Sequence, residues 1–80
     1  MKKFKVYLIT DEPGRKVWQE LRDGNVIMKY TAILGSDCWT LYSKLGTRKA
    51  TGAVGDLMRT FPDLENLCLF LGVNNPSPPS

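Results

Sequence analysis

Alternating apolar and polar residues in the first half of the chain predict a β-hairpin around Asp23 and Gly24. A two-residue Asp-Gly turn fixes the pairing of the strands beside it, so we expect Arg22 opposite Asn25. Regular pairing from this point divides the side chains between the two faces of a sheet. An apolar face would carry Val17, Gln19, Leu21, Val26, Met28 and Tyr30. The opposite face, whose mixture of aromatic and charged residues a core would not select, would carry Lys16, Trp18, Glu20, Arg22, Ile27 and Lys29.

A second turn, at residues 11–14, supports the same division. A four-residue loop there sets Thr10 opposite Arg15 and Tyr7 opposite Trp18, an aromatic pair that contributes about 0.2–1 kcal/mol. The apolar face then gains Phe4, Val6 and Leu8. A five-residue loop would turn these three side chains outward, and the lost burial, about 1.5–3 kcal/mol for each, argues against it.

A helix over residues 12–22 is the alternative to the second strand. Pro13 suits the first turn of a helix, apolar residues follow at helical spacing, and Gly24 would end it. This alternative gives a β-α-β start and places Trp18 in the core, whereas the strand leaves Trp18 exposed. The consistent pairing and the strand-like residues 26–34 favour the strand.

Residues 38–45 predict a fourth strand after a turn at residues 35–37. If the loop includes Cys38, then Trp39 and Leu41 point inward, and a three-residue loop reverses the two faces. We prefer the longer loop because these two residues are the better core candidates. This choice adds to the aromatic and basic face Thr40, Tyr42 and Lys44.

The last third of the chain predicts two helices. The first spans about residues 51–60, although Gly52 and Gly55 each weaken it by about 1 kcal/mol relative to alanine. Its apolar stripe comprises Ala50, Val54, Leu57, Met58 and Phe61. The second helix runs from residue 62 or 63 to residue 71 and ends at Gly72. Its stripe comprises Leu64, Leu67, Cys68 and Leu71.

These elements together predict an α+β fold, in which a four-stranded antiparallel meander sheet is followed by two C-terminal helices packed on one face. A β-α-β-β-α order replaces it if residues 12–22 are helical. Residues 1–72 would form a single small domain, and residues 73–80 a tail rich in proline and serine.

The charge of the chain is basic and uneven. Eleven Lys and Arg against eight Asp and Glu give a net charge of +3, and residues 1–50 alone carry an excess of five positive charges. This balance permits binding to a polyanion. No apolar run approaches the roughly 18 residues of a membrane span, and two distant cysteines suit a reducing compartment, so we expect a cytoplasmic protein without membrane contact.

The residue types present argue against catalysis. The chain contains no histidine, the commonest general base and metal ligand, and two distant cysteines do not make a zinc site. The loop at residues 46–52 has glycines, Arg48 and Lys49 ahead of an expected helix, which suits contact with phosphate. It lacks the Walker pattern. We therefore expect no enzymatic activity, no metal and no cofactor.

A binding surface is the strongest functional prediction. Aromatic rings among lysines stack bases while neutralising phosphates, at about 1–3 kcal/mol per stacked base. We expect a non-enzymatic protein that binds nucleic acid, or a protein of a nucleic-acid-handling complex. The partner-binding residues would be Lys3, Lys5, Tyr7, Lys16, Trp18, Lys29, Tyr42, Lys44, Arg48 and Lys49. Because the same residue types are enriched at protein interfaces, the alternative is a stoichiometric inhibitor or adaptor that binds only protein, as phage and mobile-element accessory proteins do.

Overall fold

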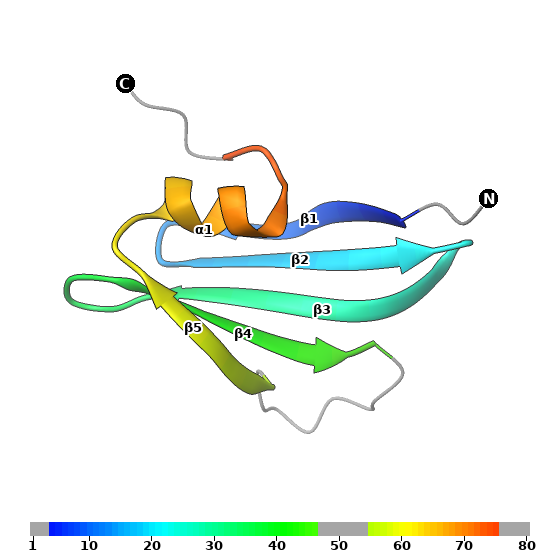
Figure 1. Cartoon of the computed structure of the whole chain (residues 1–80), viewed down its shortest axis with the longest axis horizontal. Helices are drawn as coiled ribbons and strands as arrows, with labels where there is room; N and C mark the ends of the chain where they lie inside the picture. The colour runs from blue at the N-terminus through cyan, green and yellow to red at the C-terminus, as the bar shows by residue number, and fades with distance from the viewer. Residues whose placement is uncertain (1–3, 47–54, 76–80) are drawn as a thin grey trace.

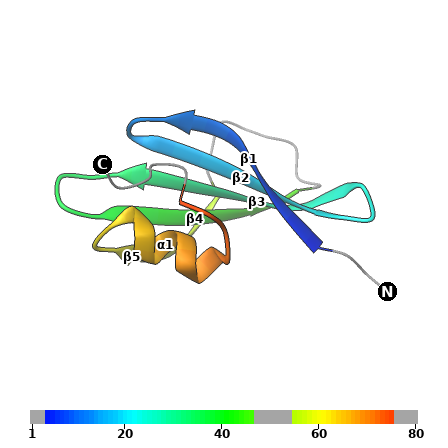
Figure 2. The same cartoon turned by 90° about the horizontal axis from the view of Figure 1, so that it is seen from above.

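A computed structural model of the chain describes residues 4–46 and 55–75. The elements are β1 (Phe4–Glu12), β2 (Arg15–Arg22), β3 (Asn25–Leu34), β4 (Trp39–Leu45), β5 (Asp56–Phe61) and α1 (Leu64–Leu71). The five strands lie side by side in chain order, and each is antiparallel to its neighbours (Figure 1). Helix α1 packs on one side of this sheet (Figure 2). We call that side the helix face and the opposite side the bare face.

The turn between β2 and β3 forms as the sequence predicts. Asp23 and Gly24 both have positive φ, 52° and 82°, as a two-residue type I′ turn requires. Arg22 lies opposite Asn25, and Leu21 lies opposite the next residue of β3. The Asp-Gly turn and the first two pairs of the hairpin are confirmed.

Beyond those two pairs the predicted register is wrong, because β3 contains a β-bulge. Glu20 lies opposite Met28, so Ile27 has no partner, and Trp18 lies opposite Tyr30 rather than opposite Lys29. A second bulge in β1 leaves Ile9 unpaired and sets Trp18 opposite Leu8 instead of Tyr7.

Because of these two bulges, the side chains of β2 lie on the faces opposite to those predicted. Directly opposed residues share a face, so the partners settle the face of each residue. Of β2, the bare face holds Arg15, Val17, Gln19 and Leu21. The helix face holds Lys16, Trp18 and Glu20. The predicted faces of β2 are therefore wrong, whereas Tyr7 of β1 and Lys29 of β3 lie on the predicted side.

Trp18 is consequently a core residue, and its predicted exposure is wrong. Only 2% of its surface is exposed. It packs in a cluster with Ala32, Trp39, Leu41, Phe61, Leu64, Leu67 and Cys68. The helical alternative for residues 12–22 is wrong too, because β2 is a strand. A strand with Trp18 buried combines one feature of each interpretation.

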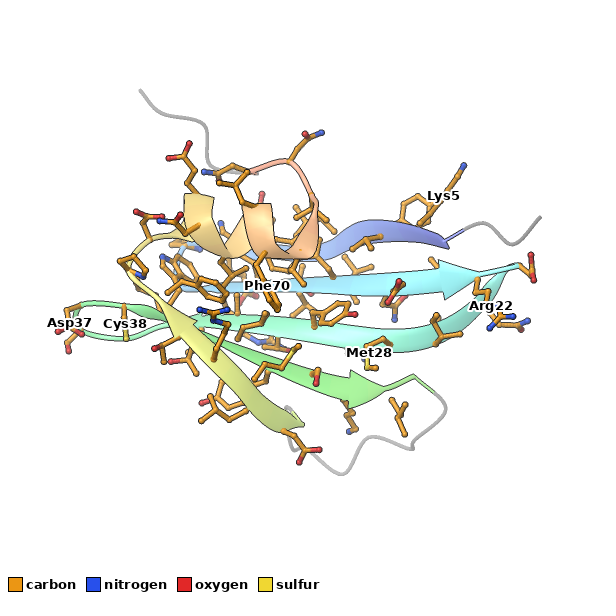
Figure 3. The ribbon with its side chains drawn as sticks, viewed as in Figure 1. Lys5, Arg22, Met28, Asp37, Cys38 and Phe70 are labelled. Carbon is orange, nitrogen blue, oxygen red and sulfur yellow. The ribbon has the colours of Figure 1, made fainter. Side chains whose placement is uncertain are left out.

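Strand β4 follows the longer of the two loops considered. Trp39 and Leu41 are buried, with 8% and 0% of their surfaces exposed. Cys38 lies in the loop before the strand, next to Asp37 (Figure 3). Tyr42 and Lys44 accordingly lie on the bare face, opposite Thr31 and Lys29 of β3. The predicted faces of this strand are confirmed.

The predicted helix over residues 51–60 is wrong for the part that the structure describes, because Asp56–Phe61 is strand β5. Gly55, just before it, has a φ of 107°, and a side chain there would collide with the carbonyl oxygen of Ser43. Of the three stripe residues that the structure describes, Leu57 and Met58 are exposed and Phe61 is buried. Pairing with β4 satisfies the backbone of this segment, which helical spacing alone could not reveal. Residues 51–54 lie outside the described ranges.

The last predicted helix is confirmed as α1. The Asp63 side chain accepts a hydrogen bond from the Asn66 backbone N–H, 2.8 Å away, and so caps the first turn. Gly72 follows the last residue. Leu64, Leu67 and Cys68 are buried, while Leu69 and Phe70 lie off the stripe and are exposed. Among the described residues, no helix has the length and apolar character that crossing a membrane needs.

Over residues 4–46 and 55–75 the fold is thus α+β, as expected, with five strands and one helix in place of four strands and two helices. One more strand joins the meander, and a single helix covers one end of the helix face. The order of β1 to β4 and the position of α1 at the end of the chain match the prediction.

Candidate nucleic-acid interface

The bare face collects half of the residues expected to bind a partner. These are Lys5, Tyr7, Lys29, Tyr42 and Lys44. Lys16 and Trp18 do not join them, because both are buried on the helix face. Lys3, Arg48 and Lys49 lie outside the described residues, so the predicted contribution of the loop at residues 46–52 stays a prediction.

A single row of side chains crosses four strands of the bare face. Tyr7 of β1 lies opposite Gln19 of β2, which lies opposite Lys29 of β3, which lies opposite Lys44 of β4. Three strand spacings separate the ends of this row, or about 14 Å. Tyr42 belongs to the neighbouring row. The face therefore carries rings, an amide and ammonium groups across the width of four strands.

The accessibility of these side chains differs between the edge and the middle of the sheet. Lys5 and Tyr7, on the edge strand β1, are exposed, and Tyr7 has 48% of its surface free. Lys29, Tyr42 and Lys44 are partly buried. Val17 and Thr31, opposed to each other in the middle, are buried. The accessible groups thus surround a closed centre, which suits a ligand lying along the surface.

The two faces of the sheet differ in net charge. In the described strands, four cations lie on the bare face, namely Lys5, Arg15, Lys29 and Lys44. Their one acidic neighbour is Glu12, whose Oε1 lies 3.7 Å from Nη1 of Arg15. The helix face of the same strands carries the acids Asp11, Glu20 and Asp56 and also the cations Lys16, Arg22 and Arg59, so its charges balance. The bare face is consequently the positive side of the sheet.

Two of the cations directly oppose each other. Lys29 and Lys44 form a cross-strand pair between β3 and β4. Like charges in this position destabilise a sheet, because the ammonium groups repel at close range. An anion bound between them would relieve the repulsion. This pair therefore concentrates positive charge in the middle of the face.

Lys16 has a different role from the one the sequence suggests. Its ammonium group donates a hydrogen bond to Oδ1 of Asp11, and only 5% of its side chain is exposed. It lies on the helix face directly opposite Ala32. The charge is neutralised inside the protein and cannot reach a partner.

Cys68 is a buried thiol without a nucleophilic role. Cys38 and Cys68 are both free, and Cys68 has 2% of its surface exposed. Burial raises the pKa of the Cys68 thiol, although the nearby charge of Lys16 acts in the opposite direction. The thiol is thus protonated at neutral pH and packs as an apolar group. The described residues also include no group of three acids or cysteines that could hold a metal ion.

Sequence reasoning missed Gln19 and Arg15 on this face. Regular pairing placed Gln19 in the core and Trp18 in solvent, which is the reverse of what their polarities favour. That conflict was a signal of an irregular register, because one extra residue in each neighbouring strand resolves it.

A shallow groove of about 290 Å³ adjoins the exposed side of Tyr7. It runs between β1 and the residues after α1, and Val6, Tyr7, Leu8, Trp18, Val73 and Asn74 line it. This lining contains no charged side chain, so the groove does not extend the phosphate-binding surface.

Comparisons of the chain with protein-family models, curated proteins and solved structures found no match.

Proposed function

We propose that this protein is a non-enzymatic binding protein that docks the bare face of its sheet onto a nucleic acid, most plausibly a single strand. Lysines 5, 29 and 44 would contact phosphates, and Tyr7 and Tyr42 would stack on bases. Gln19, between Tyr7 and Lys29, offers an amide that both donates and accepts hydrogen bonds.

The observation that supports this proposal best is the net positive charge of the bare face. Its four cations include the opposed pair Lys29 and Lys44, and Glu12 is the one acid on this face of the described strands. The bare face has aromatic rings within the same rows as the cations. Stacked bases are sequence-tolerant ligands for such rings, because every base has a π-face.

The test is binding of a fluorescently labelled single-stranded oligonucleotide, followed by anisotropy at a series of salt concentrations. Three lysine contacts should give a log-log salt slope near −2, at roughly 0.7 per phosphate on a single strand. Replacing Lys29 and Lys44 together with Gln should reduce the magnitude of the slope by about 1.4. Tyr7→Ala and Tyr42→Ala should each weaken binding by about 1–3 kcal/mol with little change of slope.

Arg22→Gln is the matched control for the lysine variants. It removes one positive charge at the tip of the β2–β3 hairpin, away from the row of Lys29 (Figure 3). Its salt slope should stay close to that of the unchanged protein. An oligonucleotide that fails to bind at low salt, or a slope that the double lysine variant leaves unchanged, would refute the proposal.

The alternative function, an inhibitor or adaptor that binds only protein, is separated by the same experiment. It requires no affinity for the oligonucleotide. Capture of one dominant protein from cell extract, lost in Tyr42→Ala, would then support it.

A further inference from the structure

Strand β5 forms one edge of the sheet and is unusually accessible. Every residue of Asp56–Thr60 is exposed, and Leu57 and Met58 have 63% and 41% of their surfaces free. The strand pairs with β4 on one side only. An exposed apolar edge strand is a template for pairing with another chain, because its outward N–H and C=O groups have no partner in the sheet.

Helix α1 adds an aromatic ring beside this edge. Phe70 projects from α1 on the side where β5 runs (Figure 3), and its ring centroid lies 5.5 Å from that of Phe61. It is 48% exposed. The accessible apolar groups therefore continue from the strand onto the helix.

The charges along β5 are complementary to a second copy of the same strand. Asp56 and Arg59 both lie on the helix face, opposite Ser43 and Leu41 of β4, because Met58 between them is the extra residue of a β-bulge and has no partner in β4. Asp56 makes no hydrogen bond or ion pair with any described residue. The Arg59 guanidinium lies over the rings of Phe61 and Phe70, 5.1 Å and 5.5 Å from their centroids, with no acid against it among the described residues.

Antiparallel pairing of two β5 strands about a two-fold axis between Leu57 and Met58 joins these groups. Each Asp56 then lies opposite Arg59 of the other copy, and each Leu57 lies opposite Met58. Because the axis is normal to the sheet, both helix faces stay on one side, so the opposed charges share a face. The contact is isologous and closes at two copies.

We propose that two copies of this chain associate edge to edge through β5 into a continuous ten-stranded sheet. The inference does not depend on the proposed nucleic-acid binding. If both hold, the two bare faces form one positive surface of twice the width.

The test uses sedimentation equilibrium of the full chain over a range of concentrations. The unchanged protein should shift from 9.0 kDa towards twice that mass. Asp56→Arg should weaken association at least tenfold, because two attractive pairs become two repulsive ones. This variant should keep its melting temperature, since the exposed Asp56 side chain makes no hydrogen bond or ion pair with a described residue.

Arg59→Asp should be monomeric as well, and mixing the two variants should restore association. In the mixed pair, each Arg of one chain faces an Asp of the other. Recovery on mixing separates interface repulsion from misfolding of either variant. Arg22→Gln, which removes a charge at the tip of the β2–β3 hairpin away from β5, serves as the control and should associate like the unchanged protein.

Three outcomes would overturn the inference. The first is a protein that stays at 9.0 kDa at the highest concentration. The second is a dimer that neither charge variant weakens, which would place the interface elsewhere. The third is association that continues beyond two copies, which would indicate head-to-tail pairing of β5 with β1.

Discussion

The two faces of one sheet differ in what their side chains do. On the helix face, Trp18, Ala32 and Leu41 are buried beneath α1, and even the cation Lys16 is enclosed. On the bare face, Lys29 and Lys44 oppose each other across neighbouring strands. The first arrangement stabilises the fold, whereas the second costs stability. The contrast indicates that the helix face specifies the structure and that the bare face is available for a ligand.

The sharpest test of this contrast compares an aromatic residue from each face. Trp18→Ala should lower the free energy of unfolding by about 3–5 kcal/mol, because it empties the centre of the core. Tyr42→Ala, on the bare face, should cost much less. Urea unfolding followed by far-UV circular dichroism measures both. Equal losses from the two variants would mean that the faces do not differ in this way.

The second test concerns the enclosed cation of the helix face. Asp11→Ala should cost about 1–3 kcal/mol, because it leaves the buried ammonium of Lys16 without its acid partner, although Asp11 itself is half exposed. Adding Lys16→Met to that variant should recover most of the loss. A double-mutant cycle from thermal unfolding gives the coupling. Without recovery in the double variant, Lys16 would not be an enclosed charge.

The third test addresses the bulge that assigns residues to the faces. Deleting Ile27 should cost about 1–2 kcal/mol from lost partial burial, while the domain stays folded with Trp18 buried. The pairs of Leu21 with Val26 and of Glu20 with Met28 both survive, because Ile27 has no partner. Tryptophan fluorescence and thermal unfolding check this. In a regular hairpin the same deletion would exchange the faces of β3 and unfold the domain.

The bulges also show which features of the fold could not be predicted from the sequence. The turn at Asp23 and Gly24 follows from local chemistry, because both residues tolerate positive φ. The cap and stripe of α1 follow from local chemistry too. A bulge has no such local signature, since Ile27 is as strand-like as its neighbours. Its position depends on Trp18 reaching the core, a long-range gain that pairing rules do not include.

Strand β5 illustrates a second limit. Leu57, Met58 and Phe61 have the spacing of a helix stripe, and only the vacant edge of β4 makes them a strand. Part of the candidate site was predicted correctly from the sequence for a related reason. Tyr42, Lys44 and Lys29 lie where alternation predicts, because β4 follows β3 without a bulge. Lys16 and Trp18, the two described site residues that the prediction misplaced, both lie on β2, which has a bulge in each neighbour.

The fourth test uses the titration of Tyr30 on the helix face. Burial, then the 2.9 Å hydrogen bond to Glu20 and its negative charge, raise the pKa of Tyr30 to about 12. The ordinary value is 10.0, so the folded state resists ionisation, and stability should be lost as pH rises from 10 to 12. Tyr30→Phe should cost about 1 kcal/mol at pH 7 and flatten this dependence. Urea unfolding at several pH values measures it, and an equally steep loss in the variant would contradict the assignment.

The smallest expected effect is the one that most directly separates stability from binding. Lys29→Gln should raise the free energy of unfolding by about 0.2–0.5 kcal/mol, because it removes the repulsion from Lys44. The same change should weaken oligonucleotide binding, so the two quantities move in opposite directions, as expected where a site is maintained at a cost to the fold. Thermal unfolding at low and high salt gives the first quantity, and the gain should shrink as salt screens the repulsion. A loss of stability instead would show that packing of the lysine stem outweighs the repulsion, and the bare face would then resemble an ordinary solvated surface.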